Sequence, residues 1–359
     1  MLAELKSKAQ GLRHEHALRG LLGECRRLLS ERGEANGVAI AAGIVDRLEA
    51  LSDDRRALFF DHLARDFSPD PQLVLASAQA YAKQPDAEQL LRLTQATEPP
   101  RQELFRRLNR APGGTAAIVR MRRALLERLP KHPQLRAVES DLLHLLSSWF
   151  NAGFLQMRRV DWNSPAQLLE QIIRHEAVHE IDGWDDLRRR LQPDRRLFAF
   201  FHPQLPDEPL IFVEVAMTTE MPGAIAPLID KKSPPLASDQ FKVAVFYSIS
   251  NCQPGLRNVS LGNFLIKRVA DELKRELPQL KTFCTLSPIP TLVPWLAKLR
   301  VDALQGLKPQ QVEQATAALT LLRAHGGSDL SGLGHAPTLH ALPALAHQAL
   351  WRMAALYLV

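Results

Sequence analysis

The sequence predicts an α+β fold in which an all-helical N-terminal region precedes a region of mixed helices and strands. Apolar residues recur at helical spacing through residues 1–155. After them come two β-rich segments and then a strand, loop, helix and strand unit between residues 242 and 290. We therefore expect a helical bundle over residues 1–155 and a mixed α/β domain over residues 156–359, a division that the chain length allows.

Helix start and stop signals divide the N-terminal region. Ser52-Asp53-Asp54 predicts a helix start with acidic residues in its first turn, and Thr115 predicts a second helix cap. Prolines at Pro71 and at Pro99-Pro100 end one helix and begin the next. The last helix, near residues 142–150, is strongly apolar. Because no catalytic group of residues stands out here, we interpret the region as a helical assembly domain.

The second region alternates between helices and strands. A helix is predicted from Ser164-Pro165 to about Glu180, and a polar, proline-bearing loop covers residues 230–238. Residues 292–358 are again predicted to be helical, with Pro309 at a helix start. Further elements are predicted as a helix at Trp184–Leu191, strands at Leu197–Phe201, Leu210–Met217, Val243–Tyr247 and Lys281–Ser287, and a helix from near Ser260 to Leu277.

Composition excludes several classes of protein. A hydrophobic content of 46% with 23% charged residues is typical of a soluble globular chain, and no apolar run reaches the roughly 18 residues of a membrane span. The charged N-terminal segment lacks the apolar core of a secretory signal. Cys25, Cys252 and Cys284 are too few and too scattered for a disulfide framework or a zinc cluster. We expect a cytoplasmic protein without a membrane partner.

The net charge of +6 permits either a polyanionic partner or simply a mildly basic soluble protein. Basic clusters at Arg26-Arg27, Arg106-Arg107, Arg122-Arg123 and Arg188–Arg190 alternate with apolar residues at helical spacing. This pattern predicts solvated helix faces, and few aromatic residues accompany them. We expect no nucleic-acid partner.

His175-Glu176-Ala177-Val178-His179 matches the His-Glu-x-x-His pattern of zinc peptidases. On a helix, both histidines would face one way, as two zinc ligands must. The histidines also continue an apolar stripe, and no third ligand follows at suitable spacing, so we favour a structural role and expect no metal. His202, Cys252 and Cys284 are likewise interpreted as structural, because neither cysteine has a histidine nearby in sequence.

The loop between the strand at Val243–Tyr247 and the following helix is a candidate anion site. Its residues are Arg257, Asn258, Val259, Ser260, Leu261, Gly262 and Asn263. Gly262 would let the backbone approach a phosphate, Arg257 would add charge, and the helix start would add its dipole. The loop resembles the pyrophosphate loop of GCN5-related acetyltransferases, although Ser260 replaces the middle glycine.

The run FYSISNCQPGLR, NVSLGNFLIKRV, LKRELPQLKTF and TLSPIP resembles the malonyl-CoA decarboxylase family. Further similar segments are PPRQELFRRLN, EAVHEI, GWDDLRRRL, FAFFHP and LPDEPLIFVEVA, so the likeness covers nearly the whole chain. The resemblance implies a helical oligomerisation domain and an acetyltransferase-like domain that binds acyl-CoA. It also implies a homo-oligomer, a tetramer, that converts malonyl-CoA to acetyl-CoA and carbon dioxide without a metal or organic cofactor.

By this resemblance, the loop Arg257–Asn263 holds malonyl-CoA and Ser287 is the active-site serine that contacts the malonyl group. The family pairs the serine with a proton-donor histidine in a later Phe-His segment that precedes Asn-Gly-Ala. None of the downstream histidines, His325, His335, His340 and His347, has that context. We therefore expect the chain to stop short of that histidine. The sequence Thr291-Leu292-Val293 also differs from the family's Gly-Phe.

Three functions follow from these observations. The first is a carboxy-lyase acting on malonyl-CoA, with weak or no activity unless His340 or His347 acts as the donor. The second is an acyl-CoA-binding or acyltransferase-type protein that uses the same loop without decarboxylation. The third is a non-catalytic partner in an oligomer. Release of carbon dioxide from malonyl-CoA separates the first from the other two.

Overall fold

A computed structural model describes residues 17–30, 36–300 and 306–358, except for the side chains of residues 262, 263, 336 and 340. The chain divides into two compact units, the first ending at Leu286 and the second beginning at Ser287. The predicted boundary at residue 155 lies within the first unit, between α8 (Arg136–Trp149) and β1 (Gln156–Val160), and stays a prediction.

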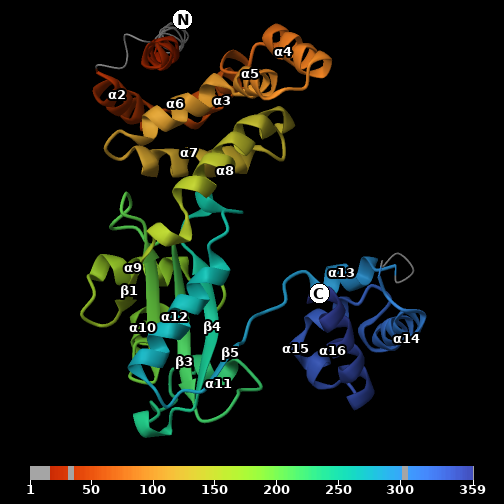
Figure 1. Ribbon diagram of the computed structural model, residues 1–359. Coiled ribbons are helices and arrows are strands. Elements are labelled where there is room, and N and C mark those ends of the chain that lie inside the picture. The colour runs from red at the N-terminus through yellow and green to blue at the C-terminus, as the bar shows by residue number, and fades with distance from the viewer. Residues whose placement is uncertain (1–16, 31–35, 301–305, 359) are drawn as a thin grey trace, which may run out of the picture. The chain divides into compact units, whose positions relative to one another are not determined.

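The N-terminal part of the first unit is helical, as predicted (Figure 1). Residues 17–29 form a helix ahead of the labelled elements. The labelled helices are α2 (Gly37–Glu49), α3 (Asp53–Asp66), α4 (Pro71–Lys83), α5 (Ala87–Thr97), α6 (Pro100–Asn109), α7 (Gly114–Arg128) and α8. Their apolar stripes form a common core that includes Phe59, Leu104, Leu125 and Leu142.

The start signals explain several of these helix boundaries. α3, α4 and α6 begin at or next to the predicted positions. Asp70 caps α4 by accepting a hydrogen bond from the N–H of Gln72 at 2.9 Å. The predicted cap at Thr115 is wrong, because α7 begins one residue earlier and the Thr115 hydroxyl instead donates to Asn109 Oδ1 at 2.8 Å.

A five-stranded sheet in the order β1-β2-β3-β4-β5 follows. Neighbouring strands are antiparallel except β4 and β5, which are parallel. The strands β2 (Arg195–Phe201), β3 (Ile211–Thr218), β4 (Val243–Asn251) and β5 (Thr282–Thr285) lie within one to four residues of the predicted limits. The edge strand β1 was not predicted, because its sequence QMRRV lacks a β-rich run.

Helices cover both faces of the sheet (Figure 1). α9 (Ala166–His175) and α10 (Gly183–Arg190) pack on the face that carries Ala199, Phe201 and Phe212. α12 (Gly262–Glu276) packs its Leu265, Val269 and Leu273 on the other face. The alternation of side chains along β2 explains why both faces are apolar. A short helix, α11 (Ala226–Ile229), precedes β4.

The second unit is helical, as predicted for residues 292–358. It contains α13 (Leu292–Lys298), α14 (Pro309–Gly326), α15 (Ala336–His340) and α16 (Ala344–Leu358). Its own core joins Leu296, Leu319, Leu322, Leu330 and Met353. The α+β class is therefore confirmed, with a helical bundle, a mixed sheet layer and a separate small helical core.

Candidate functional site

The loop after β4 forms a tight turn at Arg257-Asn258. The N–H of Val259 donates to the carbonyl oxygen of Leu256 at 3.0 Å. Arg257 has φ −53° and ψ 134°, and Asn258 has φ 67°. These angles define a type II turn, whose third position requires the left-handed backbone that asparagine tolerates better than most residues. The sequence therefore uses Asn258 to shape the turn.

A buried arginine on α7 fixes this turn from behind. The Nη1 group of Arg122 donates to the carbonyl oxygens of Gly255 and Arg257, at 2.7 and 2.8 Å. Its Nη2 group donates to Glu139 Oε1 on α8 at 2.7 Å, and the Arg122 side chain is fully buried. A Cβ atom at Gly255 would lie 2.0 Å from the carbonyl oxygen of Val119. Glycine at that position therefore lets the loop lie directly against α7.

The outer side of the turn presents backbone donors. In the described part of the chain, the N–H groups of Asn258, Ser260 and Leu261 have no acceptor. α12 begins at Gly262, two residues after the predicted start, and its N-terminus adds a partial positive charge. The Asn263 side chain lies outside the described part of the structure. Asn258 and Ser260 are exposed, as is Arg257, so an anion in solvent can reach their N–H groups, whereas Leu261 is buried.

Ser287 is exposed and follows the strand β5 by two residues. The N–H of the intervening Leu286 donates to the carbonyl oxygen of Phe246 on β4 at 2.8 Å, which holds the chain in the sheet up to that point. Ser287 is the first residue of the second unit, whereas Arg257–Leu261 belong to the first. A joint site formed by the serine and the loop therefore stays a prediction.

A second turn follows Ser287 within the second unit. Thr291 has φ 62°, a left-handed conformation that is rare for a β-branched residue. The Tyr357 hydroxyl on α16 donates to the carbonyl oxygen of Pro290 at 2.9 Å and accepts from the Thr291 hydroxyl at 2.7 Å. These two hydrogen bonds tie the turn to the C-terminal helix.

The helix predicted through His175–His179 ends at His175 instead. Glu176 adopts φ −65° and ψ 110°, and its Oε1 accepts the N–H groups of Val178 and His179, each at 2.8 Å. The same carboxylate accepts hydrogen bonds from Ser248 and Ser250 on β4. The two histidines are thus not on one helix, and the His179 Nε2 atom is buried without a hydrogen-bond partner among the described residues.

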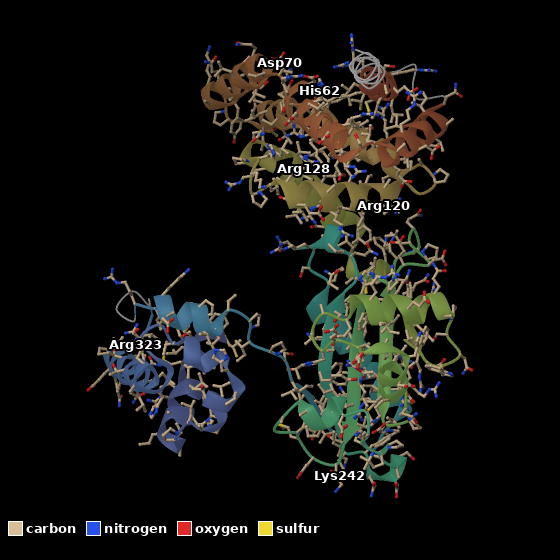
Figure 2. All side chains as sticks on the ribbon, turned by 180° about the vertical axis from the view of Figure 1, so that it is seen from behind. His62, Asp70, Arg120, Arg128, Lys242 and Arg323 are labelled. Carbon is tan, nitrogen blue, oxygen red and sulfur yellow. The ribbon has the colours of Figure 1, made fainter. Side chains whose placement is uncertain are left out.

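His175 instead lies in the wall of a cavity of about 310 Å³ between α7, α9 and the start of the loop. Arg120, Arg123 and Arg174 also line this cavity. Figure 2 labels Arg120, which pairs with Glu49. Burial and then the charges of Arg174 and Arg123 lower the pKa of His175. In the described residues, no group of three or more His, Cys, Asp or Glu side chains is arranged to hold a metal ion.

The basic clusters were predicted to be solvated, and three of their arginines are buried instead. Arg122 is bound by the loop and Glu139, as described above. Arg189 donates to both Asp194 oxygens at 2.8 and 3.0 Å, and Arg190 donates to Asp186 and, at 3.0 Å, to Glu214. Burying a guanidinium is tolerable only with such partners. Asp186 lies on the same helix as Arg190, four residues earlier, whereas Glu139, Asp194 and Glu214 lie outside the helices that carry the arginines, where helical spacing does not reveal them.

Glu214 is the central residue of this buried network. Its Oε2 accepts from Arg190, whereas its Oε1 is buried without a hydrogen-bond donor among the residues that the structure describes. Burial raises the pKa of Glu214 to about 7, against the attraction of Arg190. Tyr247 lies opposite in a β-bulge, since Glu214 pairs with Ser248 and Val215 pairs with Phe246.

His202 and Cys252 are buried in structural environments, as predicted, whereas Cys284 is only partly buried. The His202 ring donates from Nε2 to the carbonyl oxygen of Trp149 at 3.2 Å and accepts at Nδ1 from the Gln204 N–H. Burial raises the pKa of the Cys252 thiol and that of Cys284. Neither cysteine therefore has the low pKa of a nucleophilic thiolate.

Comparison with known proteins decides the family. The family model for the malonyl-CoA decarboxylase C-terminal domain matches residues 153–354, and the model for the N-terminal domain matches residues 67–150. The chain belongs to the malonyl-CoA decarboxylase family. This confirms the resemblance found in the sequence. None of the described helices is long and apolar enough for a membrane span.

Two curated malonyl-CoA decarboxylases that match this chain are longer than it is. The mitochondrial malonyl-CoA decarboxylase of Anser anser anser is 40% identical over 266 residues, which cover 70% of this chain and 52% of that protein. The Mus musculus enzyme is 38% identical over 287 residues, covering 76% of this chain and 58% of that protein. The chain thus spans just over half the length of these relatives.

Two solved structures of malonyl-CoA decarboxylases share the fold. The protein from Rhodopseudomonas palustris is 47% identical with a TM-score of 0.79, and the match covers 95% of this chain and 80% of that one. The protein from Agrobacterium vitis is 45% identical with a TM-score of 0.73, and the match covers 88% of this chain and 77% of that one.

The sequence analysis did not predict that Arg122 and Tyr357 stabilise the two turns.

Proposed function

We propose that this protein acts on malonyl-CoA as a decarboxylase and releases acetyl-CoA and carbon dioxide. Family membership across both domains is the principal support. The turn at Arg257-Asn258 supports it further, because the exposed residues Asn258 and Ser260 have N–H groups without an acceptor in the described part of the chain. Such donors beside a helix N-terminus suit the diphosphate of CoA. We propose that Arg257–Asn263 form this phosphate-binding loop.

The reaction breaks the bond between the carboxylate carbon and the methylene carbon of the malonyl group. The electron pair of that bond moves into the thioester, giving an enolate whose negative charge lies largely on the thioester oxygen. We propose that the exposed Ser287 hydroxyl donates a hydrogen bond to this oxygen. A fixed donor at such an oxygen is typically worth about 10²–10³ in rate.

The enolate carbon must then take up a proton from a general acid. By resemblance to the family this acid is a histidine, and the candidates in this chain are His340 and His347. His347 lies on α16 and is partly buried, whereas the His340 side chain lies outside the described residues. Full turnover by a protein in which both are alanine would exclude both as the donor.

The direct test measures carbon dioxide release from malonyl-CoA. We expect turnover by the wild-type protein and a fall of about 10²-fold or more in kcat for Ser287→Ala, with little change in affinity for CoA. Binding of CoA without carbon dioxide release would instead indicate the acyl-CoA-binding alternative. Absence of both CoA binding and turnover would contradict the proposal.

We also propose a homo-oligomer, a tetramer, that forms through the helical region. α4 has no buried residue and exposes Leu73 and Leu75, while the neighbouring α5 exposes Leu90 and Leu91. Apolar residues on adjacent helices that lack a covering element are typical of a subunit contact. Light scattering on the wild type and on the Leu75→Glu, Leu91→Glu protein tests whether these residues form the subunit contact.

A cytoplasmic location likewise stays a proposal, since the names of the goose and mouse relatives place those proteins in mitochondria.

A further inference from the structure

We infer that Arg122 is a positioning residue for CoA binding, because it holds the Arg257-Asn258 turn in the orientation that presents its amides to phosphate. The inference rests on the proposed function for the identity of the ligand. It assigns to the helical region a part in the binding site, through one side chain on α7.

The orientation follows from peptide geometry. The peptide unit between Arg257 and Asn258 is trans, so its C=O and N–H groups point in opposite directions. Arg122 Nη1 binds the C=O of Arg257 at 2.8 Å. The N–H of Asn258 therefore points away from α7, and it has no acceptor in the described structure.

This peptide unit is also the one that can flip. A type II turn differs from a type I turn mainly by rotation of its central peptide, and the type I form does not need the left-handed conformation at its third position. Asn258 at φ 67° is therefore held in the less favourable arrangement for an L-residue. A second hydrogen bond, from Arg122 to Gly255 at 2.7 Å, fixes the chain just before the turn. Without Arg122, the amide of Asn258 would be free to turn inward.

Arg101 provides a matched control for the loss of a buried arginine. It lies on α6, is 4% exposed, and donates to Asp141 on α8 at 2.6 Å and to Ser68 at 2.7 Å. Both arginines thus join helices of the same core through a carboxylate on α8. Only Arg122 reaches the loop.

The experiment compares Arg122→Met with Arg101→Met in the full chain, using calorimetric titration with CoA and amide hydrogen exchange of residues 253–261. We expect the Kd for CoA to rise about tenfold or more in Arg122→Met only, with faster exchange in the loop in that variant only. Arg122→Lys keeps the charge but loses the guanidinium fork, in which Nη1 binds the two loop carbonyls and Nη2 binds Glu139. We expect the Kd for CoA to rise about threefold in this variant, which replaces Arg122→Met in the comparison if the methionine variant does not fold.

Equal CoA affinity and equal loop exchange in the Arg122 and Arg101 variants would overturn the inference. An equal loss of affinity in both would also overturn it, since that result indicates a general effect on the helical core. Wild-type protein that fails to bind CoA would refute the proposed function instead. In that case the exchange comparison still decides whether Arg122 holds the turn.

Discussion

The two turns near the candidate site residues share a left-handed backbone conformation and differ in the side chain that stabilises it. Asn258 in the loop and Thr291 after Ser287 both have left-handed backbone at a residue other than glycine. Each turn is held by a side chain distant in sequence, Arg122 in one case and Tyr357 in the other. Arg122 is charged and fully buried, whereas the hydrogen bonds of Tyr357 are exposed.

This difference determines how much each turn depends on its support. Removing a buried guanidinium leaves two carbonyl groups and a carboxylate without their donor, with little water to replace it. Removing an exposed hydroxyl leaves groups that water can satisfy. We therefore expect the Arg257-Asn258 turn to lose its conformation when Arg122 is replaced. The turn after Ser287 should keep its conformation when the Tyr357 hydroxyl is removed.

The largest effect should come from Arg122→Met. Loss of its bonds to Gly255, Arg257 and Glu139 should lower the free energy of unfolding by about 3 kcal/mol, at the lower end for a broken buried ion pair because Glu139 is 18% exposed. Urea unfolding of the first unit measures this change. A decrease in the free energy of unfolding of less than about 1 kcal/mol would show that the buried Arg122 stabilises its turn no more than the exposed Tyr357 does.

The stability of Glu214→Gln as a function of pH tests a buried charge of the first unit, in contrast to the uncharged Tyr357 hydroxyl of the second unit. Because folding raises the pKa of Glu214 from 4.5 to about 7, its contribution to stability is present below pH 4.5 and is lost as pH rises towards 7. Glutamine does not titrate. The free energy of unfolding of the variant, relative to that of the wild type, should therefore increase by up to about 3 kcal/mol as the pH rises from 4.5 to 7.

Histidines whose pKa values are lowered by burial, such as His175 and His202, oppose this trend in the wild-type curve. They are present in both proteins and cancel in the difference, which is the quantity to plot. A difference that does not change between pH 4.5 and 8 would show that Glu214 stays ionised throughout, held by Arg190.

The smallest effects concern the turn residues themselves. At both positions 258 and 291, the glycine variant should be more stable than the alanine variant by about 1 kcal/mol, because only glycine adopts φ near +65° without strain. Tyr357→Phe should cost about 1 kcal/mol or less. Thermal unfolding of the four variants and of Tyr357→Phe provides the measurement. Alanine equal to glycine at either site would show that the turn there relaxes.

The fold class, most helix limits and the family could be predicted because each rests on local pattern or on contiguous sequence. Apolar spacing places α12 and the helices of the second unit, and prolines at Pro71, Pro100 and Pro309 mark the starts of three helices. The long run from Lys242 to Pro290 carries the family resemblance. The loop itself was found from Gly262 and its position between a strand and a helix.

What the sequence could not predict depends on partners far apart along the chain. The spacing of Arg122 on α7 fits a solvated face, and its burial follows from Gly255, 133 residues later. The end of α9 at His175 depends on Glu176 reaching Ser248 and Ser250 on β4. Tyr357 carried no signal in its own neighbourhood. In each case a polar group satisfied by a distant residue overrides a local pattern.

The central claim is that the turn at Asn258 binds the phosphates of CoA, and calorimetric titration of Asn258→Val with CoA and with pantetheine, which lacks the phosphates, tests it directly. A β-branched residue at φ 67° is strongly disfavoured, so the turn should change shape. We predict that the variant binds CoA at least about tenfold more weakly than the wild type and binds pantetheine equally well. Equal affinity of wild type and variant for CoA would contradict the claim.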